Sequence, residues 1–432
     1  MEKTRLAVAA ILGCVLAFTI PLHAQTIISG NISGTWSPSG NPYIISDNAT
    51  VPSGQTLTIQ PGVVVWIGEG LSITVNGNIQ AIGTASQRIT IQAPISSQYW
   101  SQITLNNNYN PEYPNNVTTN QFQYCDLSDA TNAILINDAV LPADVEIRNC
   151  TFSNDEASAI NDGGEGTTNL MVENCLFSET GNGCVFSSYY GAYADISANI
   201  FNNLSGKAIL IQGGSDVTAI NNAIVNCAGG VNAGNFGTAQ IQNCIFDGCS
   251  VAIVASDSNS RTISYNDFFG NTTNFVGYPS TYGTPIILNR NGTSCDLLYN
   301  IFQDPQFVSA TDFHLQGTSP CIDAGEGSAA NFDNSFPPSL GNVTNDIGAY
   351  GGPNAGQWLV PAPSSFLTLA AARYIGVTIN PPSAGHYELD YASALAGTNN
   401  WIQITNMDLS APFLYTEPAS APARFYRAEK LY

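Results

Sequence analysis

One stretch of the sequence, NDEASAINDGGEG, gathers acidic side chains that could bind a cation. Its acidic members are Asp155, Glu156, Asp162 and Glu165. Carboxylate oxygens are the ligands that Ca²⁺ prefers in proteins. A polysaccharide lyase combines such an ion with a base near the sugar C5 proton, and Arg148 and Lys207 are the bases on either side. The cluster is a candidate calcium site; the alternative is a set of solvated turn residues.

Other catalytic patterns are absent from the sequence. It contains no Gly-x-Ser-x-Gly elbow, no phosphate loop and no dinucleotide fingerprint. No CxxC pair occurs, and only His314 and His386 follow the N-terminal segment, so a zinc site is not expected. We therefore assign no catalytic residue and expect no required cofactor, with calcium as the one candidate ion.

Tyrosines in loops rich in Gly, Asn and Pro suggest a second kind of chemistry. They occur in SSYYGAY and GYPSTYG and include Tyr189, Tyr190, Tyr193, Tyr278 and Tyr282. Sugar faces stack on such rings while nearby Asn, Asp and Ser side chains fix hydroxyl groups. These tyrosines are candidate glycan-binding residues; the alternative is that the rings cover the flank of the fold.

A repeated phrase dominates the middle of the chain, as in RNCTFSND, ENCLFSET and QNCIFDGC. Its polar or thiol position is occupied by Cys125, Cys150, Cys175, Asn199, Asn222, Cys244, Asn266 and Asn300. The residue two positions later is Leu127, Phe152, Phe177, Phe201, Ile224, Phe246, Phe268 and Phe302. Successive spacings are 25, 25, 24, 23, 22, 22 and 34 residues. A nearly constant period of this size is typical of a solenoid.

The segments between the phrases indicate which solenoid this is. Short β-branched runs such as Val145-Glu146-Ile147 are separated by turn residues, and no stretch shows helical apolar spacing. At about 3.3 Å per residue, one repeat suits three short strands joined by turns. Parallel strands joined in this way cross over right-handed. The sequence therefore predicts an all-β fold, a right-handed parallel β-helix.

This fold explains the repeated phrase, because each position lies about 4.8 Å above its counterpart in the next coil. The Phe residues are expected to stack in one column inside the coil. Asn at the polar position is expected to tolerate a left-handed backbone and to hydrogen-bond the Asn of the next coil. Cys is a small buried substitute there. Stacking of like on like also explains why only 10% of residues are charged.

Cysteines permit disulfides if the chain is exported. Ten cysteines, less Cys14 in the N-terminal segment, leave nine, an odd number. Cys227 and Cys249 each follow their anchor by three residues and form one candidate pair, and Cys295 with Cys321 forms another. For the cysteines of the repeated phrase, we expect buried thiols.

The N-terminus resembles a secretory signal peptide, with Lys3 and Arg5 before an apolar run from Leu6 to Ile20. We expect residues 1–24 to be removed after Ala24 and the protein to be secreted or held at the cell surface. No other apolar segment is long enough to span a membrane. The net charge of −21 opposes binding to nucleic acid.

The ends of the repeat resemble exported bacterial β-helix proteins of pectate-lyase-like architecture. The opening, Val51 to Thr84, reads VPSGQTLTIQPGVVVWIGEGLSITVNGNIQAIGT, and the closing region contains DFHL, SPCIDAG and DIGAYGGP. The resemblance implies a right-handed β-helix over residues 26–352. It says little about activity, since the group includes lyases, hydrolases and adhesins.

A separate unit is expected at the C-terminus. Residues 353–365, which begin PNAGQWLVPAP, have the composition of a linker. Residues 366–432 contain alternating runs separated by turn signals and predict a small antiparallel β-sandwich. The ending RFYRA resembles a module that follows repeat domains in exported bacterial proteins, which implies a sorting or attachment role; a packed edge strand is the alternative.

These observations favour a non-catalytic surface or matrix protein that presents a rigid face to a polysaccharide or to the extracellular matrix. The alternative is a polysaccharide lyase or glycoside hydrolase whose site the sequence does not reveal. A purely structural adhesin is the second alternative.

Overall fold

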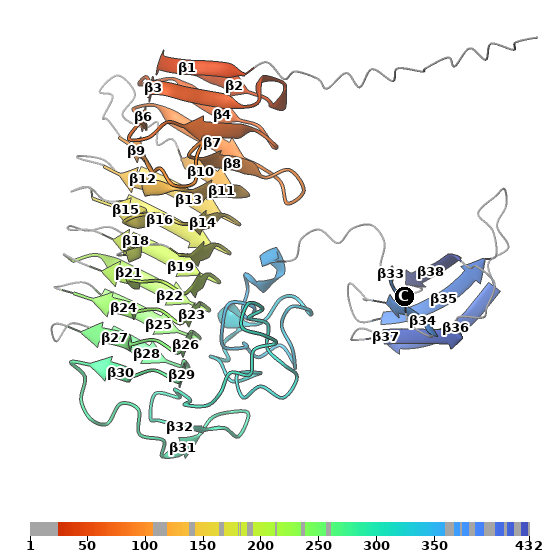
Figure 1. The fold of residues 1–432 in the computed structure, drawn as a ribbon. Coiled ribbons are helices and arrows are strands. Elements are labelled where there is room, and N and C mark those ends of the chain that lie inside the picture. Colours follow the sequence, from red (N-terminus) through yellow and green to blue (C-terminus); the bar gives the residue numbers. More distant parts are fainter. Residues whose placement is uncertain are drawn as a thin grey trace, which may run out of the picture.

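The computed structural model describes residues 25–358, except 107–118, 138–142, 164–167, 180, 182, 188–192, 212–213, 235–237 and 256–260, together with six later strands. Residues 25–276 form a parallel β-solenoid in which three strands make up one coil (Figure 1). This confirms the fold that the repeat predicts. Among the described residues the only helical elements are three 3₁₀ turns, η1 (Pro38–Gly40), η2 (Ala329–Asn331) and η3 (Ala355–Trp358).

Three columns of stacked parallel strands form the walls. Sheet one contains β1 (Thr26–Asn31), β3 (Tyr43–Val51), β5 (Val64–Ile67), β8 (Ile89–Gln92), β11 (Cys125–Ser128), β14 (Thr151–Ser153), β17 (Leu176–Ser178), β20 (Ile200–Asn202), β23 (Ala223–Val225), β26 (Ile245–Asp247) and β29 (Asp267–Phe269). Sheet two contains β6 (Ser72–Val75), β9 (Trp100–Leu105), β12 (Ala130–Ile136), β15 (Ser158–Asp162), β18 (Gly183–Ser187), β21 (Lys207–Ile211), β24 (Gly229–Ala233), β27 (Val251–Ala255) and β30 (Thr273–Val276). The long β1 and β3 run through both columns.

Sheet three contains ten described strands. They are β2 (Gly34–Trp36), β4 (Thr56–Ile59), β7 (Asn78–Ile82), β10 (Asn120–Gln123), β13 (Ala143–Arg148), β16 (Thr168–Glu173), β19 (Tyr193–Ser197), β22 (Asp216–Ile220), β25 (Thr238–Gln242) and β28 (Arg261–Ser264). Alternate residues of these strands point into the core and out to the surface, so each outward row repeats once per coil.

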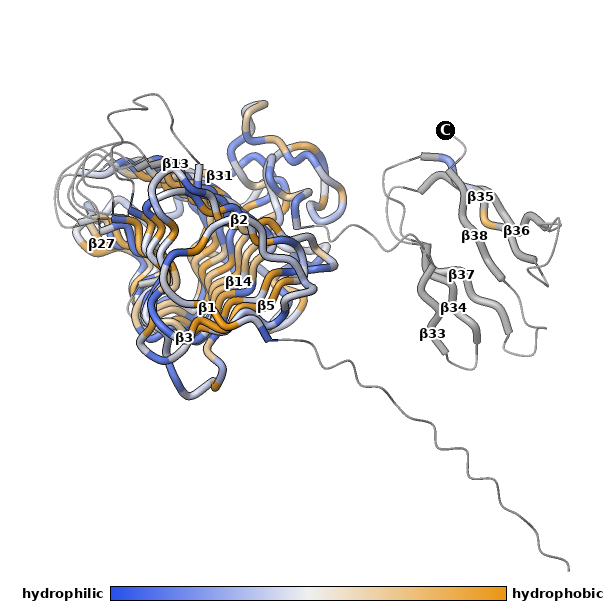
Figure 2. The backbone as a smooth tube through the Cα atoms, turned by 90° about the horizontal axis from the view of Figure 1, so that it is seen from above, coloured by the Kyte–Doolittle hydropathy of each residue, from blue (hydrophilic) through white to orange (hydrophobic). Residues whose placement is uncertain are grey.

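The core consists of columns of like residues. Phe152, Phe177 and Phe201 stack with ring centroids 5.0 and 4.8 Å apart and nearly parallel planes. Phe246 and Phe268 stack in the same way at 5.0 Å. Figure 2 looks along the solenoid and shows the hydrophobic residues gathered on the stacked strands. The register predicted from the repeated phrase is therefore the register of the core.

The corner between sheets three and one holds two adjacent columns. The ladder residue lies inside, where the Asn199 amide donates to Oδ1 of Asn222 (3.1 Å) and to the carbonyl oxygen of Val172 (2.9 Å). Contrary to our expectation, the left-handed residue is the one before it, such as Asn149 (φ 54°) or Asn174 (φ 53°). The inner residue turns its side chain into the coil, so the preceding residue must reverse the chain direction.

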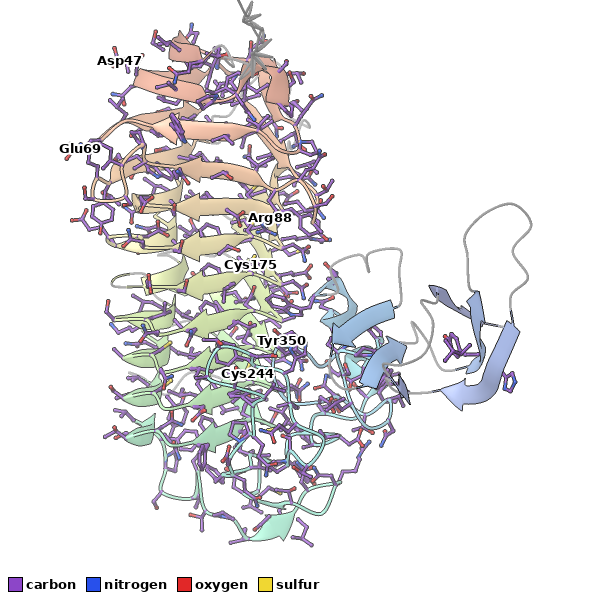
Figure 3. The ribbon with its side chains drawn as sticks, turned by 45° about the vertical axis from the view of Figure 1, so that its right-hand side comes forward. Asp47, Glu69, Arg88, Cys175, Cys244 and Tyr350 are labelled. Atoms are coloured by element: carbon purple, nitrogen blue, oxygen red, sulfur yellow. The ribbon has the colours of Figure 1, made fainter. Side chains whose placement is uncertain are left out.

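Neither candidate disulfide, Cys227–Cys249 or Cys295–Cys321, is formed. All eight that the structure describes are buried reduced thiols: Cys125, Cys150, Cys175, Cys227, Cys244, Cys249, Cys295 and Cys321. Cys227 and Cys249 stack in adjacent coils, but their sulfurs lie near the carbonyl oxygens of Val225 (3.3 Å) and Ile224 (3.6 Å). Parallel side chains of this kind favour thiol–carbonyl contacts over a bond. Figure 3 labels Cys175 and Cys244 on the stacked strands.

The regular strands end at Val276, well before the boundary at 352 that the sequence suggested. A two-stranded hairpin follows, β31 (Ile287–Leu288) and β32 (Ser294–Cys295), and one further ladder step in which Asn266 donates to Asn300 (3.1 Å). The rest of the segment has little regular structure and lies beside the solenoid (Figure 1).

Residues 345–358, here called the strap, run back along the corner column. Asn221 donates to the carbonyl oxygens of Asp346 (2.9 Å) and Gly348 (3.1 Å). Two coils nearer the N-terminus, Asn174 donates to the carbonyl oxygen of Asn354 (3.0 Å). The last contact joins Asn149 to the carbonyl oxygen of Gln357 (3.0 Å). Residues 353–358, assigned to a linker from the sequence, therefore belong to the strap.

The strap also has an apolar underside. Tyr350 packs on a small cluster that includes Ile200, Val225 and Phe313, and its label in Figure 3 lies beside the strands. His314 stacks on the Tyr350 ring at 3.7 Å between centroids. The strap is thus fixed by hydrogen bonds along one line and by an apolar contact beside it.

The later strands form two antiparallel sheets of three strands each. One contains β33 (Leu367–Ala371), β34 (Tyr374–Ile379) and β37 (Phe413–Pro418). The other contains β36 (Ile402–Leu409), β35 (Gly385–Ala392) and β38 (Phe425–Lys430). These strands coincide with the alternating runs in the sequence; their packing as a sandwich stays a prediction.

Candidate functional site

The outer face of sheet three carries an unbroken central row of side chains, one from each coil. In order, the row is Thr35, Thr58, Gln80, Gln121, Glu146, Met171, Asp195, Thr218, Gln240 and Thr262. All except Met171 can donate or accept a hydrogen bond. At about 4.8 Å per step the row is about 40 Å long.

A second outward row lies near the N-terminal ends of the same strands. It comprises Asp144, Asn169, Tyr193, Asp216 and Thr238. Tyr193 is 49% exposed and neighbours Asn169 and Asp216 in register. This is the one glycan-binding candidate from the sequence that the structure describes on this face, and it places an aromatic ring beside hydrogen-bonding groups.

Three ionisable side chains of this face meet near the strap. Nε of Arg148 lies 3.3 Å from Oε2 of Glu173, in the next coil. Burial raises the pKa of Glu173 above its usual range, against the opposing effect of Arg148. Burial likewise raises the pKa of Asp195, and the Ser197 hydroxyl and Arg148 oppose that rise. Two carboxyl groups thus hold protons more readily than in water, beside one guanidinium group.

The strap forms a wall next to these groups. Nδ2 of Asn354 donates to Oε1 of Glu173 (3.2 Å) and to Oγ of Ser197 (3.1 Å). Between strap and sheet lies a cleft of about 160 Å³, and its lining includes Asp195, Ser197, Asn221, Asn331 and Asn354. The cleft offers carboxyl, hydroxyl and amide groups beside the apolar side chains of Ala198, Ile220 and Pro353, which suits a group that carries both hydroxyls and apolar carbon, as a sugar does.

The arrangement supports two kinds of chemistry. The rows offer repeated hydrogen bonds along a straight line, which suits an extended polymer of equivalent units. Glu173 and Asp195, with raised pKa values, could also serve as proton donor and acceptor.

The three described members of the predicted acidic cluster, Asp155, Glu156 and Asp162, do not come together as a cation site. Asp155 and Asp162 are both buried; Asp155 lies three residues before β15, and Asp162 is the last residue of that strand. Oδ1 of Asp155 accepts from the Ala130 amide (3.1 Å), and Glu156 accepts from the Thr131 hydroxyl (3.1 Å). Glu165 lies outside the described residues. No group of three potential metal ligands occurs within the described part of the chain.

The predicted tyrosine set is also dispersed. Tyr278 and Tyr282 pack on Phe275 with centroid distances of 5.9 and 5.7 Å, and they cover the end of the core. For these two tyrosines the structure therefore agrees with the alternative interpretation, in which the rings cover part of the fold. Tyr189 and Tyr190 lie outside the described residues.

Sequence reasoning missed Glu173, Asp195 and their neighbours, although part of the signal was present. Arg148 and Glu173 occupy the same place in RNC and ENC, so a periodic alignment stacks them. Asp195 lies one outward row away and shows no motif of its own. The strap residue Asn354 could not be assigned, because its contact with Glu173 spans 181 positions.

Comparison with known proteins bears on the architecture. A family model described as a right-handed β-helix region matches residues 95–238 and, in a second alignment, 132–291. That match fits a carbohydrate-related or surface role. No curated protein matches the chain at a significant level. In the residues that the structure describes, no helix is long and apolar enough to cross a membrane.

Proposed function

We propose, starting from a chain built around a right-handed parallel β-helix, that this protein is exported and binds an extended polysaccharide along the outer face of sheet three. Binding is its function in this proposal, and the glycan is not cleaved.

The observation that carries the proposal is the central row from Thr35 to Thr262. Nine of its ten side chains can hydrogen-bond, and they repeat at the strand spacing. A polymer of identical units can therefore form equivalent contacts with successive coils, and many weak contacts add up along the chain. The exposed ring of Tyr193 supplies a surface on which a sugar face stacks.

Charge narrows the class of glycan. The row and its neighbours contain Glu146, Asp195, Asp144 and Asp216, and the chain carries a net charge of −21. Carboxylates repel an anionic polymer but accept hydrogen bonds from sugar hydroxyls. The proposed ligand is therefore a neutral polysaccharide.

Export is supported by the N-terminal sequence, in which Lys3 and Arg5 precede the apolar run Leu6 to Ile20. Residues 1–24 lie outside the described residues. N-terminal sequencing of the protein recovered outside the cell should begin at Gln25. Protein found only inside the cell with Met1 intact would contradict this part of the proposal.

The binding test compares retention on a panel of neutral and acidic polysaccharides with assay of the same samples for new sugar ends. Tyr193→Ala should weaken retention about fivefold, since one stacked ring contributes on the order of 1 kcal/mol. Phe269→Ala is the matched control, because Phe269 is an aromatic residue 37% exposed on sheet one. Equal losses in both variants, or no neutral glycan retained, would refute the proposal.

Cleavage is the second candidate, and the Arg148–Glu173–Asp195 group is the observation that favours it. Incubation of each retained glycan should release no new reducing or unsaturated ends if the protein only binds. If ends appear and Glu173→Gln abolishes them while retention persists, the protein is an enzyme and the proposal that it binds without cleavage is wrong.

A further inference from the structure

A hollow of about 300 Å³ lies on the outer face of sheet two, across β21, β24 and β27. Its lining includes Lys207, Gly229, Asn232, Val251 and Val254. The hollow exists because Gly229 has no side chain at a position where the coils on either side place Lys207 and Val251.

Lys207 is placed over this hollow by its neighbours. In register it lies between Gly183 and Gly229, so neither adjacent coil supplies a side chain to support or crowd it. A Cβ atom added to Gly229 would lie 2.9 Å from Cγ of Lys207. The lysine stem therefore leans across Gly229, and Lys207 lines the hollow.

The electrostatic surroundings of Lys207 differ from those of Arg88 and Arg148. Arg88 pairs with Asp126 at 2.8 Å and Arg148 with Glu173 at 3.3 Å. No ion pair joins Lys207 to another residue that the structure describes. The outward positions of β21, β24, β27 and β30 hold Leu210, Gly229, Asn232, Val251, Val254, Thr273 and Val276 besides Lys207, and no carboxylate. In a chain of net charge −21, this is a local positive site.

The other residues that line the hollow indicate the chemistry of the uncharged part of the ligand. Val251 and Val254 present methyl groups, Gly229 presents bare backbone, and the uncharged polar side chains of the lining are those of Ser205 and Asn232. A hydroxyl-rich sugar would leave most of its polar groups unpaired here, at a cost for each buried group. A compact hydrocarbon body fits the valine methyls, and a carboxylate fits the ammonium group.

We propose that the hollow on sheet two binds a compact carboxylate with an apolar body, such as an aromatic or branched aliphatic acid. The carboxylate accepts hydrogen bonds from Nζ of Lys207, and the body rests on Gly229 between Lys207 and the valines. This site lies on a different face from the proposed glycan row, so either proposal can fail alone.

The test uses the full-length protein and saturation-transfer NMR with three probes. Benzoate carries the charge and the apolar ring, benzyl alcohol keeps the ring without the charge, and glucuronate keeps the charge on a hydroxylated ring. Benzoate should bind at least about tenfold more tightly than either, because a charge-assisted hydrogen bond and apolar contact are both needed. Tighter binding of glucuronate would overturn the proposed ligand class.

Two variants test the site by independent routes. Lys207→Met removes the charge while keeping an unbranched side chain, and Gly229→Val fills the hollow. Each should weaken benzoate binding at least about tenfold. Arg88→Met, which removes a paired cation on another face, is the control and should change nothing. Circular dichroism confirms that each variant is folded. Absence of benzoate binding, or binding that survives both substitutions, would overturn the proposal.

Discussion

The outer faces of sheets two and three are made by the same coils, yet they differ in chemistry. Sheet three presents Glu146, Asp195 and a row of amides and hydroxyls, and the strap adds a polar wall. The strands of sheet two around the hollow present Lys207, Asn232, valine, leucine and glycine. The interior imposes one register on both faces through its stacked residues. The register does not restrict the types of the outward side chains, so each face can bind a different ligand.

The largest expected effect comes from breaking the interior that both faces share. Phe177 is fully buried between the rings of Phe152 and Phe201. Phe177→Ala removes both contacts and leaves a cavity, at a cost of about 4 kcal/mol of unfolding free energy. Chemical denaturation measures the loss, and ligand binding at both faces should weaken together. Loss at one face alone would show that the faces are less coupled than the stacking implies.

A smaller effect should distinguish the two faces, because the strap borders sheet three and not sheet two. Asn221 donates to Asp346 and Gly348 from a buried position. Asn221→Ala leaves those carbonyl groups unpaired and should cost about 2 kcal/mol. Limited proteolysis should then cut within residues 345–358, while benzoate binding at sheet two persists. The control is Asn232→Ala, an outward amide on sheet two. Equal protease resistance of both variants would contradict the role of the strap.

A third prediction concerns the interior alone: the buried carboxyl group of Asp267 should make the stability of the protein depend on pH. Burial raises the pKa of Asp267 to about 8, while the backbone of Gln303 and the thiol of Cys321 donate to it. The folded state thus favours the neutral form. Its contribution to stability is fully present below about pH 4, falls by at most about 1.4 kcal/mol per pH unit, and is lost above about pH 8.

Asp267→Asn removes this titration, since the amide stays neutral. The difference in unfolding free energy between variant and parent should therefore shift in favour of the variant as pH rises from 5 to 8. Denaturation curves at several pH values measure it. A difference independent of pH would mean that Asp267 ionises normally in the folded protein.

The smallest effects are expected on the two faces themselves. Asp195→Asn on sheet three and Val254→Thr on sheet two alter outward side chains without emptying the core. Each should change the unfolding free energy by no more than about 0.5 kcal/mol. Thermal unfolding checks this. A larger change from either would show that the outward rows contribute to the fold as well as to binding.

The periodic part of the fold was predictable because stacking makes the register visible in the sequence. Phe152, Phe177 and Phe201 recur at nearly constant spacing, and they stack. The strap was not predictable, since its residues follow no period and contact Asn174 and Asn221 across more than a hundred positions. The closing region resembles that of other β-helix proteins, and this resemblance suggested further coils where the structure has the strap.

The candidate site was only partly within reach of sequence reasoning. Arg148 and Glu173 occupy the same position of the repeat, so an alignment of the repeats predicts that they are neighbours. The acidic residues near Asp155 drew attention because they are adjacent in the chain, but in a solenoid, residues about 22 to 25 positions apart are the spatial neighbours. Adjacency along the chain was therefore the wrong measure of proximity.

The direction of the strap bears on how this molecule comes apart. Repeat arrays open from their ends, one unit at a time, because each unit touches only its neighbours. Here the strap ties the corners at Asn243, Asn221, Asn174 and Asn149 to a single segment that enters from the last coils. Opening of the last coils would therefore also require breaking the hydrogen bonds between the strap and the corners of the middle coils. Because the strap links the last coils to coils in the middle of the solenoid, we expect these coils to unfold together.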